Sequence, residues 1–273
     1  MEYSIIKERN MIVASSEERL NFEPKDWRKD FKKDLSNAIK ELTSDGGYLK
    51  SKLITVEKDF FDVENVLFYN LGTSSFKKLD TKGVWFSIER GANSHNKKYV
   101  HEYSFIDSFE EIKEEIIAEW SNVIIEKPTT TRKPLDYWLS FKQSNSIKTS
   151  CFNYSEEFGL NIEISKPKNE VLNIINIQKP LLDGIIAAFH EATNIDKEII
   201  EYIVSKTQYS SEEIAKFVSD NEIAVLPQRD VIQKYREGIK WNPQDEKCID
   251  VRIIVRETDD KVYKISGCMF VKQ

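Results

Sequence analysis

Apolar residues that recur every three or four positions predict a helix within residues 22–47. The apolar face runs from Trp27 to Leu42, and Gly46 and Gly47 follow as residues that end helices. The same spacing predicts three helices in the second half of the chain, over residues 179–194, 197–206 and 210–220.

A helix is also predicted over residues 108–120. Ser108 stands in the N-cap position with Glu111 three residues later, which is the spacing of a capping box. Ile112, Ile116 and other apolar residues follow at helical intervals, so this segment is expected to be a short helix after a sheet.

Segments rich in β-branched and aromatic residues, separated by Gly and Asn, predict strands. In the first part of the chain they cover residues 48–57, 65–72, 82–91 and 98–106. In the second part they cover residues 135–143, 150–154, 159–167, 248–257 and 261–271. The last two segments flank Thr258, Asp259 and Asp260, so they are expected to form a C-terminal β-hairpin.

Strands and helices come in blocks, which favours an α+β fold with mainly antiparallel sheets and flanking helices. Residues 128–134 begin and end with proline, contain three threonines and carry no large apolar side chain, so they are the best linker candidate. The prediction is therefore two packed halves. Residues 1–127 form an N-terminal α+β half, and residues 135–273 form a C-terminal α+β half with a helical segment at 180–220.

The composition is that of a globular protein, with 273 residues of which 40% are hydrophobic and 32% charged. The net charge of −6 provides no overall attraction to nucleic acid or anionic lipid, so nucleic acid could bind only at a local basic patch. No apolar run approaches the roughly 20 residues that span a bilayer. The first residues lack the pattern of a secretory signal, and we expect a cytoplasmic location without membrane contact.

Neither the cysteines nor the histidines match a metal motif. Cys151, Cys248 and Cys268 are far apart and contain no CxxC pair, which argues against disulfides and structural zinc. His95 and His101 have no metal-ligand spacing. The sequence therefore predicts no metal site and no cofactor.

The helix predicted over residues 179–194 carries Asp183, His190 and Asn194 on one polar stripe. Seven residues of helix separate Asp183 from His190 by about 10 Å, so they cannot form a catalytic pair by themselves. Pro180 is expected in the first helical turn, and Gly184 would let another backbone approach closely. We predict a packed helix and retain Asp183 and His190 as weak catalytic candidates.

Three further acidic residues are weak catalytic candidates because magnesium nucleases gather carboxylates on neighbouring strands. They are Asp245, Asp250 and Glu257. The spacing does not match that of a nuclease motif, and Asp250 and Glu257 face opposite sides of a regular strand. The simpler interpretation is the polar face of a half-buried strand, which Asp250 shares with Arg252.

A possible anion site follows the segment 65–72. Asn70, Gly72, Thr73 and Ser74 precede Lys77, so backbone amides, hydroxyls and an amine could hold a phosphate. The stretch lacks the phosphate-binding pattern GxxxxGK[ST]. A tight connection between strands is the alternative.

No catalytic motif is present, and no motif ties the chain to a known family. The chain has 15 Phe, 11 Tyr and 5 Trp, a residue class that is enriched at the centres of interfaces. We therefore predict a non-enzymatic binding or assembly subunit of a bacterial cytoplasmic complex, such as a phage-defence accessory, with a protein partner or a second copy. Two alternatives stay open: a metal-dependent nuclease or other hydrolase, and a sensor of small ligands or nucleic acid. Whether the protein is an enzyme is not decided by its sequence.

Overall fold

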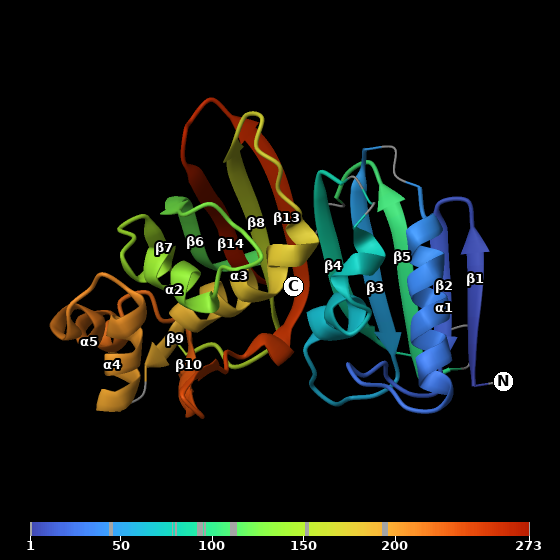
Figure 1. Cartoon of the computed structure of the whole chain (residues 1–273), viewed down its shortest axis with the longest axis horizontal. Helices are drawn as coiled ribbons and strands as arrows, with labels where there is room; N and C mark the ends of the chain where they lie inside the picture. Colours follow the sequence, from blue (N-terminus) through green and yellow to red (C-terminus); the bar gives the residue numbers. More distant parts are fainter. Residues whose placement is uncertain are drawn as a thin grey trace.

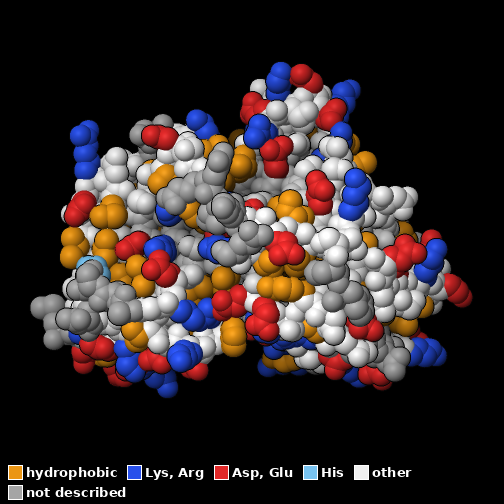
Figure 2. All heavy atoms as spheres, turned by 180° about the vertical axis from the view of Figure 1, so that it is seen from behind, with side chains coloured by type: hydrophobic (Ala, Val, Ile, Leu, Met, Phe, Trp, Pro, Cys, Tyr) orange, Lys and Arg blue, Asp and Glu red, His pale blue; other side chains and the backbone are white. Residues whose placement is uncertain are grey.

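The computed structural model is an α+β fold built on one ten-stranded mixed sheet (Figure 1). It describes residues 2–43, 46–77, 79, 81–91, 95, 97–109, 114–150, 153–192 and 196–272. Seen from behind (Figure 2), acidic and basic side chains are interspersed over the surface, with small groups of hydrophobic side chains between them. No helix in the described ranges is long and apolar enough to cross a membrane.

Strands from both parts of the chain form the large sheet. The first part contributes β1 (Tyr3–Glu8), β2 (Met11–Ser16), β3 (Tyr48–Thr55), β4 (Gly83–Arg90) and β5 (Tyr99–Ile106). The second part contributes β6 (Glu114–Ile125), β7 (Ile147–Thr149), β8 (Phe158–Pro167), β13 (Cys248–Thr258) and β14 (Tyr263–Lys272). Their order across the sheet is β1-β2-β5-β3-β4-β13-β8-β14-β6-β7.

The pairs β3–β4 and β8–β13 are parallel, and the other seven pairs of this sheet are antiparallel. Two small sheets accompany the large one in the described residues. They pair β9 (His190–Ala192) with β10 (Leu226–Arg229), and β11 (Ile232–Tyr235) with β12 (Gly238–Trp241).

The helices are α1 (Trp27–Glu41), α2 (Pro134–Lys142), α3 (Ile174–Ala188), α4 (Lys197–Lys206) and α5 (Ser211–Ser219). Short helical turns form η1 (Asn65–Tyr69), η2 (Thr73–Phe76) and η3 (Asp245–Lys247). Helix α1 packs near β1 and β2, while α2 and α3 pack together over the second part of the sheet, and α3 reaches β4 at its centre (Figure 1). Their buried apolar side chains form one continuous core with the sheet.

The two ends of the large sheet share one connectivity. In the first part, β2, α1, β3, β4 and β5 follow each other, and their strands lie in the order β2-β5-β3-β4. In the second part, β6, α2, β8, β13 and β14 occur in this chain order, with β7 inserted before β8 and the segment from α3 to η3 inserted before β13. Their strands lie in the order β6-β14-β8-β13. The two sets meet where β4 pairs antiparallel with β13, so the same arrangement occurs twice about the centre of the sheet.

Two predictions about chain connections are corrected by this sheet order. The predicted C-terminal hairpin is wrong, because β8 lies between β13 and β14 and pairs with both strands. The chain also reaches the second end of the sheet before the predicted linker at 128–134, since β6 already pairs with β14 and β7. Local turn residues cannot reveal that a third strand is inserted between two sequence neighbours.

Three predicted elements have the wrong type. Residues 65–72 contain the helical turn η1, and residues 135–143 contain helix α2, although both were predicted as strands. Residues 108–120 were predicted as a helix, but β6 begins at Glu114; the predicted cap partner Glu111 lies outside the described residues. In α2, Pro134 occupies the first turn, and the Asp136 carboxylate accepts a hydrogen bond from the Lys133 amide. These helix-starting residues favour the helix, although the run of aromatic residues after them favours a strand.

The strand predicted over residues 150–154 includes Cys151 and Phe152, which lie outside the described residues. The other strands predicted in the second part correspond to β8, β13 and β14. The helices predicted at 197–206 and 210–220 correspond to α4 and α5. A serine N-cap at Ser210 and the Glu213 carboxylate form the capping box that begins α5.

Pro180 was predicted in the first turn of a helix. This prediction is wrong, because α3 begins at Ile174 and Pro180 lies inside the helix. The helix ends at Ala188, which places His190 in strand β9; Asn194 is outside the described residues. Gly184 allows the close approach that its small size suggested, because a Cβ atom there would lie 2.5 Å from the Pro134 carbonyl oxygen at the α2–α3 contact.

Candidate functional site

The structure brings together two of the predicted catalytic candidates, Asp183 and Asp245, around the amine of Lys179. The Lys179 Nζ atom lies 3.0 Å from Asp183 Oδ1, 2.6 Å from Asp245 Oδ2 and 2.5 Å from Asp62 Oδ2. Lys179 and Asp183 are one turn apart on α3, so both side chains leave the same face of the helix. Asp62 comes from the segment before η1, and Asp245 begins η3.

Glu64 adds a fourth carboxylate to this group, which we call the Lys179 cluster (Asp62, Glu64, Lys179, Asp183 and Asp245). Glu64 is 4% exposed, and its Oε2 atom has no hydrogen-bond partner among the described residues. Together with apolar side chains of the sheet and of α3, the cluster lines a cavity of about 10 Å³. Such a cavity holds about one water molecule, so a substrate has no room to enter.

Burial and mutual repulsion shift the protonation of these groups. Burial raises the pKa of Asp62 to about 6 and that of Asp183 to about 7. It also raises the pKa of Glu64 well above its ordinary value. Burial would lower the pKa of Lys179, but the surrounding carboxylates raise it well above its ordinary value. The lysine therefore stays charged, while part of the surrounding negative charge is removed by protonation.

Asp245 behaves differently from the other carboxylates. Burial acts to raise its pKa, but the charge of Lys179 and the hydrogen bond from it outweigh burial and hold that pKa below its ordinary value. The Asp245–Lys179 pair is thus the persistent ion pair of the cluster. It connects η3 to α3, and Asp62 connects the segment before η1 to the same lysine.

The stability of the fold should fall as the pH rises from about 4 to about 7 because of Asp183. In this window the folded protein keeps the Asp183 proton that the unfolded chain has already released. Asp183→Asn removes this titration, so its free energy of unfolding relative to the wild type should rise with pH, by up to about 1.4 kcal/mol per pH unit. Urea denaturation at pH 4, 5, 6, 7 and 8 measures the difference. Asp259→Asn, at an exposed turn, is the control, and a flat or opposite trend for Asp183→Asn would contradict the expectation.

His190 does not pair with Asp183. Its Nε2 atom accepts a hydrogen bond from the Gln244 amide at 3.1 Å, so Nδ1 carries the proton and donates it to the Pro227 carbonyl at 2.8 Å. Burial lowers the pKa of His190 to about 4, which keeps the ring neutral at physiological pH. The imidazole therefore joins two backbone segments and orders the residue that precedes Asp245.

The remaining carboxylate candidates lie elsewhere. Asp250 is fully buried and accepts a hydrogen bond from Trp85 Nε1 at 2.8 Å, with the Lys272 amine 2.7 Å from its other oxygen. It points away from the Lys179 cluster, because its neighbour Val251 lines the cluster cavity and successive strand residues face opposite sides. Glu257 lies near the far end of β13, where it binds Lys166 at 2.6 Å.

No group of three or more His, Cys, Asp or Glu side chains in the described ranges is arranged to hold a metal ion. His101 is buried with its ring edge-on to Phe31, and burial lowers its pKa to about 4. Cys248 is buried and Cys268 is half-buried, and both are free thiols.

The segment predicted to bind an anion forms a turn beside α1. Asn70 is buried and donates a hydrogen bond to the Leu20 carbonyl at 2.8 Å, so its amide has a structural role. Gly72 has φ of 86°, a conformation that favours glycine, and it allows η2 to begin at Thr73. Thr73, Ser74 and Lys77 are exposed.

Ser74 lines a groove of about 450 Å³ together with lysines of α1. Contact between this turn and α1 was not predicted from the sequence. We call it the lysine groove and define it by Lys29, Lys32, Lys33, Lys40, Ser74 and Ser75. Lys77 is not among the residues that line it. The spacing of these lysines along one side of the predicted helix was the sequence pattern that could have indicated a basic groove.

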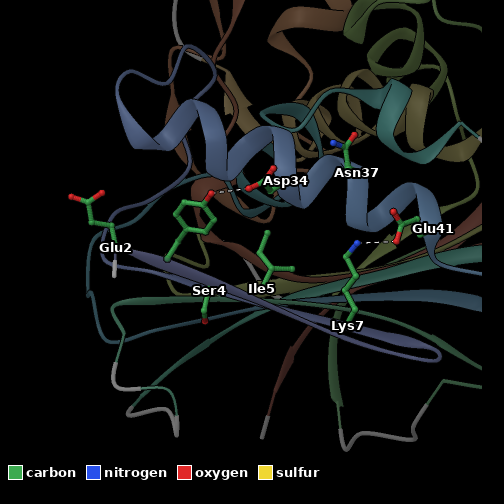
Figure 3. A pocket seen from close by; sticks show the side chains of 8 residues that line it. Glu2, Ser4, Ile5, Lys7, Asp34, Asn37 and Glu41 are labelled. Carbon is green, nitrogen blue, oxygen red and sulfur yellow. Dashed lines mark hydrogen bonds and ion pairs between the residues drawn. The ribbon is translucent and has the colours of Figure 1, made fainter.

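A larger groove of about 1210 Å³ lies between β1 and α1 (Figure 3). We call it the edge groove; it is lined by Glu2, Tyr3, Ser4, Ile5, Lys7, Asp34, Asn37 and Glu41. Ile5 and Lys7 point toward the helix, whereas Ser4 points to the other side of β1, as alternation along a strand requires. Sequence reasoning missed β1 and β2, although apolar residues and the turn at Arg9 and Asn10 mark them.

Two contacts hold β1 against α1 and leave acidic groups in the edge groove. The Tyr3 hydroxyl donates to Asp34 Oδ2 at 2.8 Å, and the Lys7 amine donates to Glu41 Oε2 at 2.8 Å. The hydrogen bond to Asp34, with burial and the nearby acidic charges, raises the pKa of Tyr3 to about 12. With three carboxylates and one amine among its lining residues, the edge groove is acidic.

Strand β1 is the last strand at its end of the sheet and pairs only with β2 in the described part of the chain. The outer backbone amides and carbonyls of β1 therefore have no strand partner among the described residues. Such an edge is a template for a further strand. No known protein family, curated protein or solved structure matches this chain, so the interpretation of these sites rests on their geometry.

Proposed function

We propose that the protein is a non-enzymatic binding or assembly subunit that receives an extended segment of a partner protein along the outer edge of β1. The observation that carries this proposal is the six-residue edge strand with an open groove beside it. In strand addition, backbone hydrogen bonds supply affinity, and pockets for alternate side chains supply specificity. The unpaired edge of β1 and the edge groove beside it support this mode of binding.

Charge complementarity indicates a partner segment with basic residues at alternate positions. The outer side of α1 carries Asp30, Asp34 and Glu41, and all three are exposed. Alternate side chains of an added strand are about 6.8 Å apart, and four residues of helix rise by about 6 Å, the interval between Asp30 and Asp34. Lys or Arg side chains at successive inward positions of the partner would therefore meet successive carboxylates.

A second copy of this chain is a less suitable occupant of the edge. If two β1 strands paired antiparallel, the two α1 helices would lie on the same face of the joined sheet. Their acidic rows would then face each other, and like charges brought together oppose association. A basic partner segment has no such conflict.

The buried carboxylates favour binding over hydrolysis. Asp183 and Asp245 line a cavity of about 10 Å³, and Asp250 has no exposed surface. A hydrolase would need these groups within reach of a substrate. The repeated connectivity of the sheet supports two packed halves, of which the first carries the binding edge. A place in a bacterial cytoplasmic complex, such as one for phage defence, is part of this proposal.

A pair of designed peptides tests the edge. One peptide alternates Lys with Thr and the other alternates Glu with Thr, and each is titrated into the protein by fluorescence anisotropy. The lysine peptide should bind at least about tenfold more tightly, since each desolvated charge pair contributes about 1 kcal/mol or more. Hydrogen exchange of the β1 amides should slow when it binds.

Asp34→Lys/Glu41→Lys should remove the preference for the lysine peptide. Glu212→Lys/Glu222→Lys, which makes the same change in charge at exposed positions in and after α5, should leave the preference intact. Peptide binding that leaves exchange at β1 unchanged would refute the proposed edge. Equal affinity for both peptides, with β1 protected, would keep strand addition and reject the basic partner.

A further inference from the structure

We propose that the lysine groove is a binding site for a small oligophosphate anion, separate from the binding edge of β1. The groove brings together four lysines of α1 and the serines of η2, and no carboxylate lines it. Its volume of about 450 Å³ is in the range of small-ligand sites. The overall charge of −6 conceals this local concentration of positive charge.

The lysines of the groove carry like charges along one helix. Lys29 and Lys33 are four residues apart on α1, and like charges at this spacing destabilise a helix. Lys29, Lys33 and Lys40 form no ion pair with the described residues, whereas Lys7 on β1 is paired with Glu41 of the same helix. A bound polyanion would remove this repulsion, and phosphate oxygens accept hydrogen bonds from several amines at once.

Hydrogen bonds order the floor of the groove. The Ser75 hydroxyl donates to the Leu71 carbonyl at 3.2 Å, and the Ser36 hydroxyl donates to the same carbonyl at 3.5 Å. The Lys32 amine donates to the Phe22 carbonyl at 2.9 Å, which positions one cation at the rim. Ser74 remains exposed in the lining, so its hydroxyl is accessible to a ligand.

The charges of α1 are separated into two sides. Asn37 lines both grooves, with the acidic row of the edge groove on one side of it and the lysines on the other. A phosphate ligand is therefore attracted to one side of α1 and repelled from the other. This separation also makes the two sites independently testable.

Isothermal titration calorimetry with inorganic tripolyphosphate tests the site. We expect saturable binding with one equivalent, and an affinity that falls as salt is added. Lys33→Ala/Lys40→Ala should weaken binding at least about tenfold, because charge-assisted contacts of two exposed amines are lost. Lys216→Ala/Lys240→Ala removes two exposed lysines elsewhere and should change the affinity less than about twofold.

Circular dichroism should confirm that both double variants are folded, since no hydrogen bond or ion pair joins the side-chain amine of any of the four lysines to another described residue. Equal weakening by both double variants would overturn the proposal, because it would indicate diffuse attraction to surface charge. Binding of single-stranded oligonucleotide but not of tripolyphosphate would overturn it as well, and would assign the groove to a nucleic-acid backbone.

Discussion

Lys179→Met should lower the free energy of unfolding by about 3–5 kcal/mol at neutral pH, the cost of leaving buried charges without their partner. The lysine amine is within 3.0 Å of Asp62, Asp183 and Asp245. Without it, these carboxylates must either remain charged in a nearly closed cavity or bind protons. Urea denaturation followed by tryptophan fluorescence measures the loss.

The loss should depend on pH in a defined direction. Without the amine, the folded carboxyl groups bind protons more strongly than in the wild type, while the unfolded chain is unchanged in this respect. Stability relative to the wild type should therefore recover as the pH falls from 7 toward 4. Lys197→Met on α4 is the control, because Lys197 is 88% exposed and its pair with Glu201 is a surface pair. A loss of less than about 1 kcal/mol for Lys179→Met would show that the cluster contributes little to the fold.

Asp250→Ala should also destabilise the protein by about 3–5 kcal/mol, because it removes a buried carboxylate that interacts with the buried Trp85 and Arg252 and with Lys272. Asp250 accepts from the Trp85 indole, and the Lys272 amine and Arg252 Nε lie 2.7 and 3.6 Å from its two oxygens. The Arg252 side chain is 8% exposed, so it cannot turn to water for a new partner. In this variant Arg252 would keep its ion pair with Glu114, at 2.8 Å, but lose its interaction with Asp250.

Two further variants test whether the loss of the buried acceptor causes the lower stability of Asp250→Ala. Asp250→Asn keeps an oxygen acceptor for the Trp85 indole but replaces the charged oxygen near the Lys272 amine with an NH2 group. It should therefore cost less than Asp250→Ala, which removes both acceptors. Glu257→Ala removes an exposed carboxylate from the same strand and should cost less than about 1 kcal/mol. If Asp250→Ala keeps wild-type stability, the buried network is not a structural element and Asp250 returns to the list of catalytic candidates.

The sequence located the elements whose patterns are simple. Helix α1 has one apolar face and an exposed polar face, so its period was visible from Trp27 onward. Strand β3 alternates buried and half-buried positions along its whole length, and it was predicted within two residues of its bounds. The α+β class followed from such segments.

The elements that were predicted wrongly are those whose apolar residues fit neither the helical nor the strand period clearly. In α2, Leu135, Tyr137, Trp138, Leu139 and Phe141 are all buried, so the segment has apolar side chains on every side. Strand β6 has Ile116 at an exposed position, and this residue contributed to the helical pattern that led to the wrong prediction over residues 108–120. For β6, pairing with β14 and β7 decided the conformation, whereas α2 also has the local start signal of Pro134 and Asp136.

The sequence by itself determined the α+β class, most of the α-helices, six strands of the large sheet and the place of Asp183 on the polar side of α3, because these depend on spacing within single elements. Only the tertiary structure decided that Asp62 and Asp245 complete the Lys179 cluster, since the nearer of them is 66 residues from Lys179 along the chain. It also decided that β1 lies at the edge and that the α1 lysines meet Ser74. Strand order depends on which apolar faces bury each other best across the whole molecule, and a local pattern contains no record of that competition.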